Sequence, residues 1–286
     1  AKKLPSQANG SARNINGSAA TEALCRIVVG PVLPTKPAQS NRRRLGVWLC
    51  GAYGGLATTV VVGARAMAKG LSECQGLATE TEIAAGIPWR PIDKLVFGGH
   101  EIRESDYATA ANEIHSETGS IPQEIIRKLK RDLATQSKNV VTGVIPNAGA
   151  TITNLASGKR HKVATLRSQI NQIKKDLKAF QKKHKLERVI CVNLTSTEPS
   201  LRLGAAHKTI AAFEKVIDKN NSKMVRPSAI YAYAAASLGM PFVHFTPSNS
   251  ALIPAVEEMF AQSNTPFMGC DGKTGETLIK SALAPM

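Results

Sequence analysis

The sequence contains few cysteines, few aromatic residues and no long hydrophobic run, and each shortage excludes a class of protein. Its five cysteines are scattered and form no CxxC pair, so the pattern indicates neither a disulfide framework nor a zinc site. No apolar run approaches the roughly 18 residues that span a bilayer, and residues 1–5 do not resemble a secretion signal. We therefore expect a cytoplasmic protein with buried free thiols, no membrane contact and no metal.

Positive charge is concentrated in two segments. The net charge is +16, of which residues 1–44 carry +7 and residues 159–188 carry +9, so the rest of the chain sums to zero. A nucleic-acid-binding protein would combine such charge with stacking aromatic residues, which make up only 5% of the chain. We therefore expect no nucleic-acid partner, and we interpret residues 1–44, rich in Ser, Asn, Ala, Gly and Pro, as a disordered basic tail.

Short apolar runs alternate with helical patterns from residue 45 onward. The runs predict buried strands at 45–50, 95–97, 140–144, 189–194 and 242–245, and the patterns predict helices at 60–69, 105–115, 122–135, 164–184, 204–219 and 228–238. This alternation predicts a doubly wound, mostly parallel α/β sheet. Helix 164–184 carries an apolar stripe and a lysine-rich face, which we interpret as a solvated surface, with an oligomer contact or an anionic partner as alternatives.

A glycine-rich turn follows the first predicted strand. Gly51 lets the chain leave the strand tightly, and Gly54 and Gly55 let backbone N–H groups approach a pyrophosphate. The N-terminus of the following helix adds a partial positive charge. The candidate cofactor-binding residues of this turn are Gly51, Ala52, Tyr53, Gly54, Gly55 and Thr58. A strand–helix turn without a ligand is the alternative.

Polar residues also follow three other predicted strands. Glu101 is placed to accept hydrogen bonds from a cofactor ribose, although a surface acid has the same pattern. Small hydroxyl residues at the C-terminal edge of a parallel sheet lie where ligands bind, but they also cap helices. The residues of this kind are Thr195, Ser196, Thr197 and Thr246. Together with the glycine turn they predict a cofactor crevice.

The last candidate segment runs over residues 269–281. Lys273 lies among glycines, and Lys280 follows about two helical turns later. Two lysines on one helix face can bind a phosphate and stabilise an enolate, and Asp271 is a candidate partner for them. Two exposed surface lysines are the alternative.

Taken in order, these segments resemble the myo-inositol-1-phosphate synthase family. The glycine turn is similar to the family's GWGGNNGST loop, residues 99–102 to its GWDIS segment with Glu101 in place of Asp, and residues 194–198 to its TANTE segment. The most specific match is to the signature GDDFKSGQTKxKS, which shares Asp271, Lys273, Gly275, Thr277, Lys280 and Ser281 with this chain. Cys270 replaces an acid of that signature, and Leu278 replaces a lysine.

The resemblance implies a fold, a cofactor and a reaction. It implies an NAD-binding Rossmann domain over 45–265 and, over 266–286, the start of a catalytic and tetramerisation domain. The family's inositol-3-phosphate synthases isomerise D-glucose 6-phosphate by oxidation, enolisation, intramolecular aldol closure and reduction, and they recycle NAD. Lys273 and Lys280 are then expected to hold the phosphate and stabilise the enolate oxygen. We expect a homotetrameric parent protein and an inactive chain on its own. Another NAD(P)-dependent Rossmann dehydrogenase acting on a phosphorylated sugar is the alternative.

Overall fold

Six parallel strands form one sheet in the residues that the computed structural model describes, which are 43–84, 87–157, 165–272 and 283. The strands are β1 (Leu45–Cys50), β2 (Leu95–Glu101), β3 (Val140–Thr142), β4 (Arg188–Asn193), β5 (Phe242–His244) and β6 (Phe267–Gly269). Their order is β3-β2-β1-β4-β5-β6, with every neighbouring pair parallel. The chain therefore starts at the centre, adds strands to one side and then crosses over to the other. This confirms the predicted doubly wound sheet, whose direction of winding reverses between β1 and β4.

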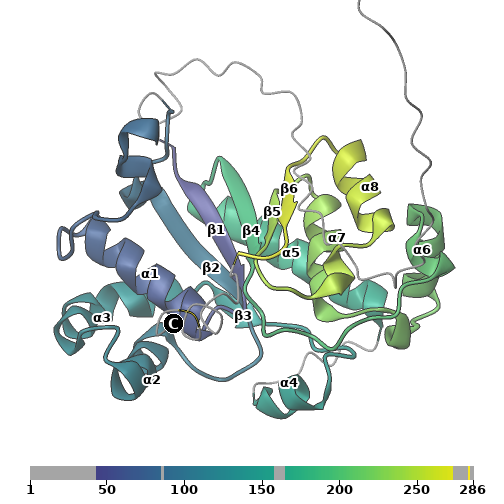
Figure 1. The fold of residues 1–286 in the computed structure, drawn as a ribbon, viewed down its shortest axis with the longest axis horizontal. Coiled ribbons are helices and arrows are strands. Elements are labelled where there is room, and N and C mark those ends of the chain that lie inside the picture. Colours follow the sequence, from purple (N-terminus) through teal and green to yellow (C-terminus); the bar gives the residue numbers. More distant parts are fainter. Residues whose placement is uncertain (1–42, 85–86, 158–164, 273–282, 284–286) are drawn as a thin grey trace, which may run out of the picture.

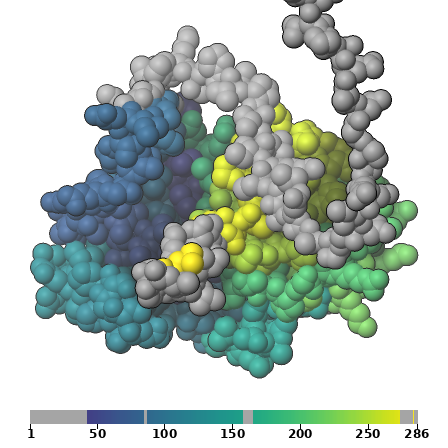
Figure 2. Space-filling model, in the orientation of Figure 1, coloured from purple at the N-terminus to yellow at the C-terminus, as the bar shows by residue number. Residues whose placement is uncertain are grey.

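Helices cover both faces of the sheet (Figure 1). One face carries α1 (Gly55–Ala68), α2 (Tyr107–Thr118) and α3 (Gln123–Ser137); the other carries α5 (Leu166–His184), α6 (Ile210–Asp218), α7 (Pro227–Ala236) and α8 (Pro254–Gln262). The short helix α4 (Ala150–Leu155) follows β3, and 3-10 turns lie at Ala78–Glu80, Glu82–Ala84, Ile92–Lys94, Ala205–His207, Ser222–Met224 and Asn249–Ala251. Figure 2 shows α1–α3 (blue to teal) and α6–α8 (green to yellow) on opposite sides of the molecule.

The central strand β1 explains why the sequence begins with an unbroken apolar run. Trp48 and Cys50 are buried in the core between the sheet and α5, α7 and α8, whereas Leu49 is buried in the core under α1–α3. A strand covered on both faces has no polar side to show in its sequence. The run at 45–50 therefore confirms the expected buried parallel strand.

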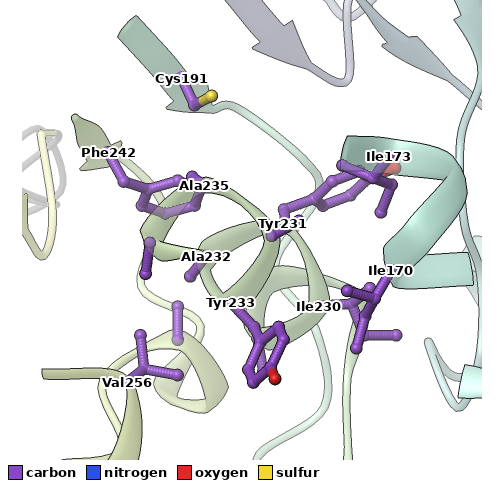
Figure 3. Packing of buried hydrophobic residues seen from close by; sticks show 14 of the residues in the cluster. Ile170, Ile173, Cys191, Ile230, Tyr231, Ala232, Tyr233, Ala235, Phe242 and Val256 are labelled. Carbon is purple, nitrogen blue, oxygen red and sulfur yellow. The ribbon is translucent and has the colours of Figure 1, made fainter. Parts of the chain in front are cut away.

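Helix α7 forms the centre of the larger core. All ten of its residues are buried, and such a helix is apolar all round rather than amphipathic. Figure 3 shows it between Ile170 and Ile173 of α5, Phe242 of β5 and Val256 of α8. Each large side chain buried there contributes about 1.5–3 kcal/mol relative to exposure, so α7 fixes the position of the strand ends beside it.

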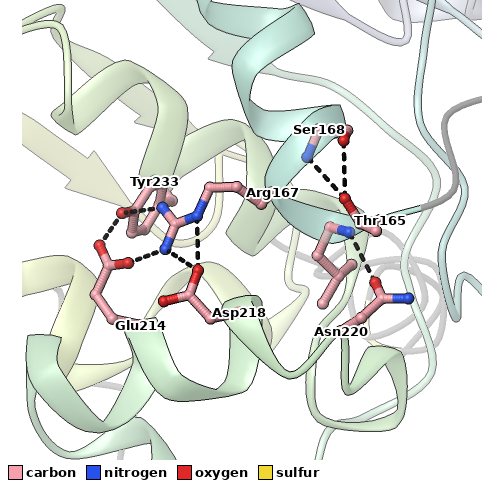
Figure 4. A network of polar contacts seen from close by, with 8 residues as sticks. Thr165, Arg167, Ser168, Glu214, Asp218, Asn220 and Tyr233 are labelled. Carbon is pink, nitrogen blue, oxygen red and sulfur yellow. Dashed lines mark hydrogen bonds and ion pairs between the residues drawn. The ribbon is translucent and has the colours of Figure 1, made fainter.

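A polar network ties three helices of this face together. Arg167, at the start of α5, contacts Glu214 and Asp218 of α6 and the Tyr233 hydroxyl of α7 (Figure 4). Glu214 in turn accepts a hydrogen bond from the Tyr233 hydroxyl. These groups are partly exposed, so each ion pair contributes about 1 kcal/mol or less. The network therefore fixes the relative orientation of the helices more than it stabilises the fold.

Several elements differ from the sequence-based expectations. The predicted helix at 204–219 is two elements, a 3-10 turn and then α6, because Thr209 caps α6 by accepting a hydrogen bond from the Ala212 N–H. Strand β6 and helices α4 and α8 were not predicted. The apolar stripe of the fourth predicted helix is confirmed, since its members are all buried: Leu166, Ile170, Ile173, Leu177 and Phe180.

The cysteines fit the expected free thiols only in part. Cys50 and Cys191 are free and buried, and burial raises the pKa of the Cys191 thiol to about 12. Cys74 is free but exposed. None of the described helices combines the length and apolar character needed to cross a membrane. The predicted tail lies outside the described residues except at positions 43 and 44.

Candidate functional site

A cavity of about 290 Å³ lies at the C-terminal edge of the sheet, where the winding reverses between β1 and β4. Open α/β sheets bind ligands at this position. The lining comes from the end of β2, the start of α1, the loops after β1, β2, β3 and β4, and helices α4 and α7. It consists of Gly51, Gly54, Gly55, His100, Glu101, Ile102, Arg103, Val144, Ile152, Leu155, Leu194, Thr195, Ser196, Glu198, Pro227 and Tyr231.

The glycine turn forms one wall of this cavity. Gly51 has a φ of +84°, and a Cβ added there would lie 3.0 Å from the carbonyl oxygen of Leu194, so the position requires glycine. Its N–H donates to the carbonyl of His100, which binds the turn to β2. At Gly55, by contrast, an added Cβ would meet no atom within 4 Å. The space beside Gly55 is therefore open to a ligand.

The N-terminus of α1 is available to an anion. Gly54 is its N-cap, no side chain caps it, and its first turn contains no acid. The first N–H groups of a helix then lack an internal partner and carry a partial positive charge. Thr58, one turn into the helix, is fully buried, and its hydroxyl has no hydrogen-bond partner among the described residues. These features fit the pyrophosphate of NAD.

Glu101 holds the glycine turn in place. Its carboxylate accepts hydrogen bonds from the backbone N–H groups of Tyr53 (2.7 Å), Ile102 (2.8 Å) and Arg103 (3.1 Å), and it is only 8% exposed. A carboxylate offers about four acceptor positions, which leaves about one for a ribose hydroxyl. Glu101 therefore combines a structural role, which the sequence did not reveal, with the proposed contact to the cofactor.

Tyr53 occupies the place of a motif glycine without blocking the cavity. Its ring points into the core and packs edge-to-face on Tyr107, with the ring centroids 5.0 Å apart. Burial raises the pKa of its hydroxyl to about 12. Its carbonyl accepts a hydrogen bond from the guanidinium of Arg103, a cavity-lining cation that also lies 3.7 Å from Glu113. The backbone of the turn is thus held from both sides.

The loops after β4 and β5 meet at Asn193, the fully buried last residue of β4. Its side-chain oxygen accepts from the Thr195 hydroxyl, and its amide group lies 3.0 Å from His244 Nδ1 and 3.2 Å from the Thr246 hydroxyl. His244 Nε2 lies 2.6 Å from the carbonyl of Ser248. Because a carbonyl only accepts, Nε2 carries the proton and Nδ1 accepts from Asn193. Burial lowers the pKa of His244, so this histidine is a neutral link between the two loops.

The cavity brings together six of the predicted cofactor residues: Gly51, Gly54, Gly55, Glu101, Thr195 and Ser196. The others lie near it without lining it: Ala52, Tyr53 and Thr58 are buried behind the glycine turn, Thr246 bonds to Asn193, and Thr197 is exposed. Sequence reasoning missed His100, Arg103, Glu198 and Tyr231. The first three are polar residues close to predicted site residues, which is a usable signal, whereas nothing in the sequence marks Tyr231.

The described part of the last candidate segment reaches the same edge of the sheet. The Gly272 N–H donates to the carbonyl of Phe245, just after β5, and Asp271 is exposed. A Cβ at Gly272 would overlap the Phe245 ring at 2.0 Å, so a larger residue at this position would displace that ring. Lys273 and Lys280 lie outside the described residues.

Comparisons with known proteins agree with this geometry. A family model for an NAD-binding domain, described as "Myo-inositol-1-phosphate synthase", matches residues 75–285. The chain is 33% identical to inositol-3-phosphate synthase 1 of Bacteroides thetaiotaomicron, over 88% of this chain and 58% of that protein. It is 26% identical to inositol-3-phosphate synthase of Dictyostelium discoideum, over 95% of this chain and 56% of that protein.

A solved structure has the same fold. The crystal structure of inositol-3-phosphate synthase from Caenorhabditis elegans matches with a TM-score of 0.66 and 20% identity, over 84% of this chain and 51% of that chain. The chain therefore spans little more than half the length of these relatives.

Proposed function

Because the chain belongs to the myo-inositol-1-phosphate synthase family, we propose that it is the NAD-binding part of an inositol-3-phosphate synthase. The parent enzyme isomerises and cyclises D-glucose 6-phosphate and regenerates its NAD in each turnover. The observation that carries this proposal is the cavity at the winding reversal, into which an uncapped, glycine-lined helix N-terminus opens. The parent protein is a cytoplasmic homotetramer in this proposal.

The proposal gives each wall of the cavity a task. Bound NAD supplies a hydride acceptor for the oxidation and a hydride donor for the later reduction. The N–H group of Gly55 binds the pyrophosphate at the start of α1, beside Gly54, whose own N–H donates to the Gly51 carbonyl. Glu101 accepts a hydrogen bond from a ribose hydroxyl. The remaining residues of the turn, Gly51, Ala52, Tyr53 and Thr58, shape it.

The hydroxyl-rich loops form the opposite wall. Thr195 and Ser196 line the cavity, and Thr246 is joined to Thr195 through Asn193. These loops follow β4 and β5, across the winding reversal from the glycine turn. A dinucleotide lies across such a reversal, so the proposal assigns the nicotinamide half of NAD to these residues, together with Thr197.

The sugar phosphate is assigned to the segment after β6. Lys273 and Lys280 neutralise the phosphate and stabilise negative charge on the enolate oxygen, and Asp271 orients them. Gly272 lies beside the end of β5, which supports an approach to the cofactor crevice. Holding the open sugar chain in a cyclic shape supplies much of the rate, because the two reacting carbons are then neighbours.

The test uses the full-length parent protein with glucose 6-phosphate and NAD⁺. We expect inositol phosphate as product without net accumulation of NADH. Lys273→Ala and Lys280→Ala should each lower kcat by about 100-fold or more while NAD⁺ still binds, whereas the exposed Lys219→Ala should retain activity. Net NADH formation from a sugar phosphate would instead indicate a dehydrogenase, and no inositol phosphate under any condition would overturn the proposed reaction.

A further inference from the structure

One buried carboxylate joins three segments at the β4 side of the crevice. Glu198 is 6% exposed and lies in the loop after β4. Its side chain accepts hydrogen bonds from the Ser228 N–H (2.7 Å), the Ser228 hydroxyl (2.6 Å) and the Ser250 hydroxyl (2.7 Å). Ser228 belongs to the first turn of α7, and Ser250 follows β5. Both serines are fully buried.

Backbone contacts continue this connection along the two loops. The Glu198 N–H donates to the Ser248 hydroxyl. Leu201, three residues after Glu198, pairs with the side chain of Asn249. That side chain accepts from the Leu201 N–H and donates to the Leu201 carbonyl, at 2.9 and 2.8 Å. The loops after β4 and β5 are therefore fastened to each other at two points, with the Glu198 carboxylate between them and α7.

The carboxylate is suited to this position by its charge as well as by its geometry. Helix α7 has no acid in its first turn, and its N-cap residue Arg226 makes no side-chain cap. Glu198 supplies from another segment the negative charge that a helix N-terminus favours. Three buried donors converge on it, and each would be costly to leave without an acceptor.

The position of Glu198 along the loop connects it to the cofactor. Thr195 and Ser196 precede it by three and two residues, and all three line the cavity. The glycine turn and Glu101 lie on the β1–β2 side of the winding reversal, which takes the adenosine half of a dinucleotide. The loop that Glu198 holds lies on the other side.

We propose that Glu198 is a positioning residue for the nicotinamide half of NAD. It acts through Ser228 and Ser250, which fix the loop carrying Thr195 and Ser196 against α7. This inference rests on the proposed NAD site. It predicts that loss of the carboxylate weakens binding of the whole dinucleotide and leaves binding of its adenosine half unchanged, a separation that general destabilisation would not produce.

The test compares NAD⁺ with ADP, which carries only the adenosine half and the two phosphates, by titration calorimetry on the folded chain. In Glu198→Gln we expect NAD⁺ to bind about tenfold more weakly and ADP to bind within about twofold of the unchanged protein. The matched control is Glu214→Gln, which removes a carboxylate that also contacts α7, through Tyr233, away from the cavity lining. It should leave both affinities unchanged.

Ser250→Ala provides a milder second variant, because it removes one of the three donors and keeps the carboxylate. It should weaken NAD⁺ by about threefold and spare ADP, and it serves if Glu198→Gln does not fold. Equal loss of both ligands, or no loss of either, would overturn the inference while leaving the NAD site in place. Failure of the unchanged chain to bind NAD⁺ would overturn the proposed site and this inference with it.

Discussion

Replacement of Glu101 by Gln should loosen the glycine turn, because the carboxylate joins a backbone N–H group of that turn to backbone N–H groups just after β2. One oxygen accepts from Tyr53, and the other accepts from Ile102 and Arg103. Glutamine keeps the shape of the side chain but replaces one acceptor oxygen with a donor NH₂ group. With the remaining oxygen on Ile102 and Arg103, the Tyr53 N–H then faces another donor.

The structure sets the size of this effect. Tyr53 is 6% exposed, so its N–H cannot turn to water, and a buried donor without a partner costs about 1–3 kcal/mol. Taking about 2 kcal/mol, the Tm of a domain of this size should fall by about 4–8 °C. NAD⁺ affinity should fall as well, since the N–H groups that bind the pyrophosphate belong to the same turn.

Urea and thermal unfolding of the purified variants measure this prediction. The matched control is Glu104→Gln, three residues further along, where the exposed carboxylate makes no hydrogen bond or ion pair within the described residues. That change should alter stability by no more than about 0.5 kcal/mol. If Glu101→Gln and Glu104→Gln had the same stability, Glu101 would not be holding the turn.

Three further predictions follow from individual sites. Gly55→Ala should not lower the Tm, since its Cβ meets no atom, but should lower NAD⁺ affinity; titration showing unaltered binding would place the cofactor elsewhere. Gly99→Ala should lower the free energy of unfolding by about 3 kcal/mol or more, because its Cβ would lie 2.2 Å from the Leu49 carbonyl oxygen. The control Gly63→Ala, within α1, should raise the free energy of unfolding by about 1 kcal/mol. Equal unfolding free energies for the two variants would contradict this. Burial lowers the pKa of His244 below its ordinary 6.5, so the unfolded chain binds the proton at a higher pH than the folded chain does. The contribution of His244 to stability is therefore fully present above about pH 6.5 and should decline below it by up to about 1.4 kcal/mol per pH unit. The pKa of His184 is also lowered, so its protonation acts in the same direction. Urea titrations between about pH 7 and 5.5 should show that the free energy of unfolding depends less steeply on pH in His244→Asn than in the unchanged chain. An equal dependence on pH in both proteins would refute the role given to the burial of His244.

The sequence was most informative where a local pattern determines the structure. The unbroken apolar run of β1 and the largely apolar sequence of α7 both reflect burial, and the strand and the helix were each predictable from the local pattern. Gly51 likewise has a positive φ, which glycine adopts more readily than other residues. Strand β6 was missed because its apolar run has only two residues, Phe267 and Met268, which lie between Pro266 and Gly269. This run is shorter than those that marked the other strands.

The candidate site was predictable in its parts but not in how they are joined. Gly54, Gly55 and Glu101 were identified because a glycine turn and a strand-end acid have local signatures. The clamp from Glu101 to Tyr53 spans 48 residues, and the bonds from Glu198 to Ser228 and Ser250 span 30 and 52. Such contacts depend on which strands become neighbours, and the strand order is set by the whole sheet rather than by any segment.

The most direct test of the account is a crystal structure of this chain with bound NAD⁺. The account predicts the pyrophosphate beside Gly54 and on the N–H group of Gly55, a ribose hydroxyl within hydrogen-bond distance of Glu101, and the nicotinamide half beside Thr195. NAD⁺ bound at another surface, or a cavity at the β1–β4 reversal that stays empty at saturating NAD⁺, would contradict it.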